Sequence, residues 1–109
     1  MDNTGVLIEF APVSARPSDG RGKSAVGERL RLTREALGLQ QNEFCERADI
    51  KPNTYNQYET GSNFPSLENA HKLCDTYRLT LDWIYRGDNS GLEYRLGEAI
   101  KALRSARSP

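Results

Sequence analysis

The sequence has few of the features that would point to a membrane protein, a secreted protein or a metal enzyme. Its longest apolar stretch lies within Gly5 to Phe10, far short of the roughly 20 residues that a membrane-spanning helix needs. Two cysteines, Cys45 and Cys74, make no disulfide framework, and with His71 as the single histidine they lack the spacing of zinc ligands. These absences predict a reduced, cytoplasmic protein with no metal site, no cofactor and no membrane partner.

An excess of charge of either sign is also missing. Fifteen Lys and Arg residues balance fifteen Asp and Glu residues, so the formal net charge is zero. This balance removes the simplest sign of nucleic-acid binding, which is a strongly basic chain, but it leaves room for a local basic face. The sequence contains no Gly-rich phosphate loop, no nucleophile elbow and no HExxH motif, so we do not expect an enzyme.

Apolar residues at helical spacing predict an all-α fold, with a compact five-helix domain over residues 25–88. Ser24, Ser66 and Thr80 are expected to cap helices, because their hydroxyl groups can accept a hydrogen bond from the first turn. Glycines are expected to end helices in the left-handed conformation. The expected helices are Val26 to Leu37, Gln41 to Ala48, Pro52 to Glu59, a fourth after Ser66 and a fifth between Thr80 and Gly87.

Two segments flank this domain. Residues 1–24 contain scattered Pro, Gly and Ser and predict a flexible N-terminal arm. Residues 89–109 predict an amphipathic helix and tail, in which Ser90 to Glu93 matches a capping box. Its apolar stripe has two interpretations: a contact between two copies of the chain, or packing against its own domain. The stripe consists of Leu92, Leu96, Ile100 and Leu103.

The stretch from Leu39 to Pro65 is the most informative. Two short helices joined by a tight turn indicate a helix-turn-helix, in which Cys45 is the small residue and Asp49 the residue that tolerates a positive φ. Tyr55 and Tyr58 are expected to face inward. The polar residues left facing outward from the second helix are Asn53, Thr54, Asn56 and Gln57.

Five blocks of sequence, taken together in order and spacing, resemble the lambda-repressor-like helix-turn-helix family, the XRE or Cro/cI-type regulators. They lie between Val26 and Gly87 and are Arg34 to Leu39, Gln41 to Phe44, Tyr58 to Gly61, Phe64 to Leu67 and Leu79 to Ile84. The resemblance implies a DNA-binding transcriptional regulator, most simply a repressor, that is associated with the nucleoid when bound. It also implies a homodimer on a palindromic operator, with half-sites about 34 Å apart.

The resemblance assigns roles to individual residues. Gln41 would meet a DNA phosphate, and Asn53 and Gln57 would face base edges, where their amides can bind adenine. Arg34 and Glu59 match an ion pair of the family that steers Arg34 toward the phosphates. The full set of predicted DNA contacts is Arg34, Gln41, Lys51, Pro52, Asn53, Thr54, Asn56, Gln57, Thr60, Ser62 and Asn63.

Three departures from the family pattern matter. Asp49 stands where glycine is usual, Lys51 stands where a Ser or Thr cap is usual, and the second helix has no outward arginine. The missing arginine favours A·T-containing sites, because arginine is the usual reader of guanine. The segment from Gln41 to Phe64 has a net charge of −2, so we expect weak non-specific attraction to DNA.

The alternative function is a protein-interaction module or an antitoxin-type component, in which binding a partner protein is the main role. Residues 1–24 have three interpretations: the partner-binding segment of such a protein, an arm that lies on DNA, or an unstructured tail with no role. In a DNA-binding protein the same arm would lie on DNA through Arg16, Arg21 and Lys23.

Overall fold

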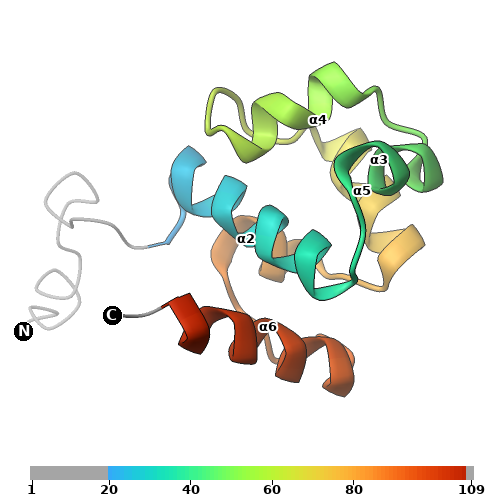
Figure 1. Cartoon of the computed structure of the whole chain (residues 1–109). Coiled ribbons are helices and arrows are strands. Elements are labelled where there is room, and N and C mark those ends of the chain that lie inside the picture. The colour runs from blue at the N-terminus through green and yellow to red at the C-terminus, as the bar shows by residue number, and fades with distance from the viewer. Residues whose placement is uncertain (1–19, 108–109) are drawn as a thin grey trace, which may run out of the picture.

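A computed structural model of the chain describes residues 20–107, and every regular element in that range is a helix (Figure 1). The all-α prediction is confirmed. In the same range, none of the helices combines the length and the apolar character that crossing a membrane requires. The elements are α2 (Lys23–Ala36), α3 (Gln41–Ala48), α4 (Pro52–Glu59), α5 (Leu67–Tyr77), the π-helical turn η2 (Asp82–Arg86) and α6 (Tyr94–Arg107).

Most of the expected N-terminal arm lies outside the described residues, but its last part does not. Lys23 and Ser24 belong to α2, so the helix begins three residues before the predicted start at Val26. Gly22 therefore occupies the capping position, and the prediction that Ser24 caps this helix is wrong.

Side-chain caps hold the starts of three later helical segments. The prediction for Ser66 is confirmed, because its Oγ accepts from the Asn69 N–H at 3.1 Å. That for Thr80 is confirmed as well, since its Oγ1 accepts from the Trp83 N–H at 2.9 Å. The capping box at residues 90–93 is wrong: α6 begins after Glu93, whose own carboxylate accepts from the Leu96 N–H at 3.0 Å.

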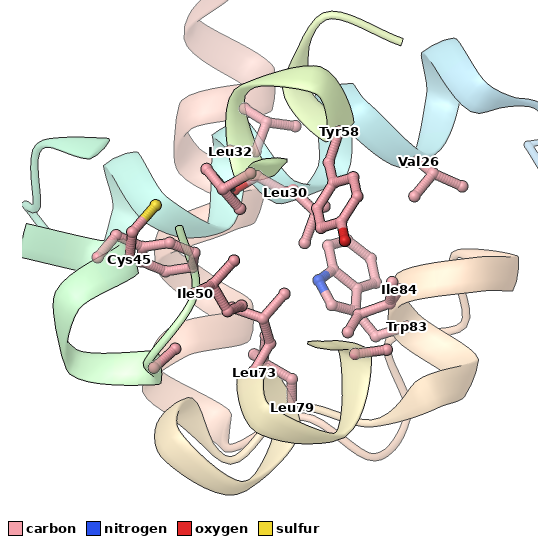
Figure 2. Packing of buried hydrophobic residues seen from close by; sticks show 14 of the residues in the cluster. Val26, Leu30, Leu32, Cys45, Ile50, Tyr58, Leu73, Leu79, Trp83 and Ile84 are labelled. Carbon is pink, nitrogen blue, oxygen red and sulfur yellow. Dashed lines mark hydrogen bonds between the residues drawn. The ribbon is translucent and has the colours of Figure 1, made fainter. Parts of the chain in front are cut away.

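Helix α2 runs through the middle of the domain, with α4 on one side and α6 on the other (Figure 1). The core beneath it joins residues from all the helices, as Figure 2 shows for Leu30, Leu73 and Ile84, which have no exposed surface. Trp83 closes this core from η2, and its indole N–H donates to Thr33 Oγ1 at 3.0 Å. A single core therefore fixes α4 relative to the rest of the domain.

Helix α6 packs against its own domain. Leu96 and Ile100 are buried in the core, and Leu92 and Leu103 are partly buried against it. At the end of the helix Arg107 forms ion pairs with two glutamates of α2, Glu28 and Glu35. Of the two interpretations of the apolar stripe, the structure shows the second. Leu96 and Ile100 are therefore buried within their own chain, with 6% and 3% of their surface exposed.

Candidate nucleic-acid interface

The turn between α3 and α4 has the conformation that the sequence predicts. Helix α3 ends at Asp49, whose φ of 59° and ψ of 49° lie in the left-handed region, unlike those of its neighbours. Lys72 of α5 donates from Nζ to the Asp49 carbonyl oxygen at 2.9 Å, and its ammonium lies 3.6 Å from the Asp49 carboxylate. The turn is therefore held from a third helix, by a residue 23 positions away that sequence reasoning missed.

The start of α4 lacks a side-chain cap, as predicted. Lys51 occupies the capping position in an extended conformation and makes no capping hydrogen bond, and Pro52 is the first helical residue. Since the first N–H groups of a helix have no intrahelical acceptor, this end of α4 offers donors to an anion. Lys51 is exposed beside them and adds a positive charge.

The two faces of α4 divide as predicted. Tyr55 and Tyr58 are buried, with 0% and 3% of their surface exposed. The Tyr58 hydroxyl oxygen accepts from Asn69 Nδ2 at 2.8 Å, which ties α4 to α5. On the opposite face lie the four polar residues that are predicted to point outward: Asn53, Asn56 and Gln57 are exposed and Thr54 is half-buried.

The end of α4 is anchored by the predicted ion pair. Arg34 donates from Nε to Glu59 Oε2 at 2.7 Å and from a terminal nitrogen to Glu59 Oε1 at 3.1 Å. A third N–H goes to the Leu39 carbonyl oxygen at 2.9 Å. The two side chains are 11% and 5% exposed. Arg34 is thus a predicted DNA contact that lies mostly below the surface, with at least three of its five N–H groups committed.

The environment of this pair keeps both groups charged. Burial alone raises the pKa of Glu59, but hydrogen bonds from Arg34, Tyr55 and Gln41 outweigh it and hold the pKa below its ordinary value. The hydrogen bond to Glu59 raises the pKa of Arg34, against the opposing effect of burial. The carboxylate therefore stays ionised and acts only as an acceptor.

Gln41 brings α3 into the same network. Its Nε2 donates to Glu59 Oε1 at 3.0 Å and to Asn56 Oδ1 at 3.2 Å. Three predicted DNA contacts, Arg34, Gln41 and Asn56, are thereby connected to one another through Glu59. The resemblance predicts the Arg34–Glu59 pair, but nothing in the sequence signals that Asn56 is part of it.

The loop after α4 wraps onto Gln57. The Gln57 carbonyl oxygen accepts from the Ser62 N–H at 2.9 Å and the Asn63 N–H at 3.2 Å. Thr60 Oγ1 adds a bond to the same oxygen at 3.3 Å, and Asn63 Nδ2 donates to the Gln57 side-chain oxygen. The structure thus brings the predicted loop contacts next to the predicted base-reading helix.

Gly27 of α2 is a further residue of this site that sequence reasoning missed. A Cβ atom at this position would lie 2.3 Å from the Tyr58 carbonyl oxygen and 2.8 Å from that of Glu59. Only glycine lets the end of α4 approach α2 so closely. A glycine inside an otherwise helical pattern was the available signal, because it costs helix stability unless close packing requires it.

The charge of the motif is less negative than its own segment suggests. Glu59 is neutralised by Arg34 of α2, and the Asp49 carboxylate lies next to the Lys72 ammonium of α5. Both partners come from outside residues 41–64.

The nearby thiol of Cys45 is not reactive at neutral pH, since burial raises its pKa to about 11.

Comparison with known proteins agrees with this geometry. Residues 30–84, about half of the chain, match the family model described as helix-turn-helix. The chain is also 30% identical over 57 residues to the cryptic phage CTXphi transcriptional repressor RstR of Vibrio cholerae serotype O1, covering 52% of this chain. It spans about half the length of that relative. No solved structure matches the chain significantly. The chain belongs to the helix-turn-helix family of the XRE and Cro/cI type.

Proposed function

We propose that this chain is a DNA-binding transcriptional regulator, and specifically a repressor, that reads the major groove with α4. One observation carries the proposal: α4 exposes a row of amide side chains while its opposite face is buried and its end is fixed to α2. An exposed helix with rigid support is the arrangement that major-groove reading needs. The similarity to a phage transcriptional repressor supports the direction of regulation.

Different residues of the interface have different roles in this proposal. Asn53 and Gln57 read base edges, while Lys51, Thr54 and the loop residues Thr60, Ser62 and Asn63 contact the phosphate backbone. Pro52 starts the helix, and the uncapped N–H groups after it face a phosphate. Arg34 and Gln41 act by positioning the end of α4, since their donors are engaged with Glu59.

We further propose that the chain binds a palindromic operator as a homodimer, because a single domain of this size covers little DNA. Since α6 packs on α2, the contact between copies does not use Leu96 or Ile100. Sedimentation of the chain alone and with a selected duplex measures the stoichiometry directly. A complex with one chain per duplex would contradict the dimer.

Binding-site selection from random double-stranded DNA tests the main proposal. The wild-type chain is expected to select a defined sequence, and Asn53→Ala and Gln57→Ala are each expected to weaken binding to it by about 1–3 kcal/mol. Asn89→Ala, an exposed amide before α6, is the matched control and leaves affinity unchanged. If no sequence is selected at low or moderate salt, the proposal is wrong and a partner-binding role is favoured.

A further inference from the structure

The hydrogen bonds around Glu59 determine which end of a surface amide faces outward. Glu59 is ionised and 5% exposed, so its oxygens only accept hydrogen bonds. The atom of Gln41 that lies 3.0 Å from Glu59 Oε1 must therefore be its amide nitrogen. This assignment follows from chemistry, because an amide oxygen in that place would face a carboxylate with no proton between them.

The same reasoning applies to Asn56 of α4. An amide nitrogen carries two N–H groups, and the second one from Gln41 reaches Asn56 at 3.2 Å. The Asn56 atom at that position must accept, so it is Oδ1. The other end of the Asn56 amide, Nδ2, has no hydrogen-bond partner within residues 20–107 and belongs to an exposed side chain.

We propose that Asn56 contacts DNA only as a hydrogen-bond donor, with its orientation set through Gln41 by the buried Arg34–Glu59 ion pair. The inference rests on the proposed function and goes beyond it by assigning a chemistry to one position. An unconstrained asparagine reads adenine with its oxygen and nitrogen together. The bond from Gln41 instead orients the Asn56 oxygen toward α3 and leaves Nδ2 as the end of the amide without a partner.

The partner of Asn56 is therefore a hydrogen-bond acceptor on DNA. In the major groove the acceptors are guanine O6 and N7, adenine N7 and thymine O4, and on the backbone they are phosphate oxygens. Adenine N6 and cytosine N4 are donor groups, so they cannot accept a hydrogen bond from Nδ2. Guanine and thymine present acceptors and no donor on this edge, whereas adenine N7 stands beside the N6 donor group, so a base contact appears as a preference for guanine or thymine at one position of the site.

Selection from random DNA with four full-length chains tests this inference. The chains are the wild type, Asn56→Leu, Gln41→Met and the control Gln40→Met, whose glutamine is exposed and makes no capping bond. Asn56→Leu keeps the size of the side chain but removes its hydrogen bonds. Gln41→Met releases the Asn56 amide without touching Asn56 itself. Thermal unfolding followed by circular dichroism verifies that each chain is folded.

For a base contact, Asn56→Leu abolishes a guanine or thymine preference at one position and weakens the selected site about 2- to 10-fold, the effect of one hydrogen bond. Gln41→Met adds adenine at that same position, because the freed amide can turn, and Gln40→Met changes nothing. For a phosphate contact, Asn56→Leu weakens all sequences by one common factor, and Gln41→Met weakens them less.

Several results would overturn the inference while leaving the proposed function in place. One is that Asn56→Leu leaves both affinity and base preference unchanged, and another is that the preference it removes is for adenine or cytosine. Equal effects of Gln41→Met and Gln40→Met would also contradict it. A wild-type chain that selects no sequence overturns the proposed function, and this inference with it.

Discussion

The two ends of α4 are held in opposite ways. Its C-terminal end is fixed by a buried ion pair between Arg34 and Glu59 and by the absence of a side chain at Gly27. Its N-terminal end begins at Lys51 without a side-chain cap, and the preceding turn depends on the exposed contact between Asp49 and Lys72. The protein thus supplies rigidity at one end and leaves unpaired N–H groups at the other, where an anion can complete the helix.

This contrast leads to a clear expectation about energy. Substitutions at the C-terminal end of α4 should be costly to folding, because they leave a buried charge unpaired or force atoms to overlap. Substitutions at the N-terminal end should be neutral or stabilising for the free protein and costly only for DNA binding. The four predictions below test that division, from the largest effect to the smallest.

The largest effect is expected for Arg34→Met. It removes the partner of a carboxylate that is 5% exposed, and breaking a buried pair typically costs about 3–5 kcal/mol. Urea unfolding measures the change in the free energy of unfolding. The matched control is Arg86→Met, which breaks an exposed pair with Asp82 and should cost under about 0.5 kcal/mol. Equal costs for the two variants would show that the Arg34 pair does not anchor α4.

Gly27→Ala should have the next largest effect. The added methyl group would overlap the Tyr58 and Glu59 carbonyl oxygens, so α4 must move away from α2, at a cost of about 1–3 kcal/mol. Gly97→Ala in α6 is the matched control, because no atom lies within 4 Å of its added Cβ. There alanine should stabilise the helix by about 0.5–1 kcal/mol. Chemical denaturation of both variants gives the comparison, and a stabilising Gly27→Ala would contradict the close approach.

The anchored end should also make stability depend on acid. The folded-state pKa of Glu59 lies below its ordinary value of 4.5, so the unfolded chain binds more protons as the pH falls. The contribution of Glu59 is therefore complete above about pH 4.5 and is lost as the pH drops through the folded-state pKa. Urea unfolding between pH 7 and pH 3 should show a smaller loss for Glu59→Gln than for the wild type. Parallel curves would mean that other carboxylates account for the acid sensitivity.

How far the sequence predicts this division depends on the range of each interaction. Helix starts at Ser66 and Thr80 are predictable because the cap and the N–H that it accepts are three residues apart. The Asp49 turn is predictable because it is also local: its positive φ depends on the type of residue at that one position. Other contacts join residues that are 15 to 32 positions apart, and local spacing does not indicate which residues come into contact over that distance. They are the contacts of Lys72, of Gly27 and between Gln41 and Asn56.

The packing of α6 could not be decided from the sequence for the same reason. The apolar stripe of α6 is visible in the sequence, but whether it covers a second copy or its own domain depends on a surface formed by α2 and η2. Arg29 illustrates this: it is 6% exposed, and its guanidinium donates to the Ile84 carbonyl oxygen, 55 residues away, at 3.1 Å. A buried arginine that binds backbone carbonyls leaves no periodic signal, so that side of the core was not predictable.

The smallest effect is expected at the open end of α4. Lys51→Ser introduces a side-chain acceptor where none exists, which should stabilise the free protein by about 1 kcal/mol. Lys51→Ala removes the same positive charge without adding an acceptor, so it should leave the free energy of unfolding nearly unchanged. On a selected duplex the two variants should bind with equal affinity. That affinity should be lower than the wild type's, because both variants lose a cation beside the phosphates. Stability and affinity would then change in opposite directions for Lys51→Ser, which cannot happen if this end of α4 is anchored like the other.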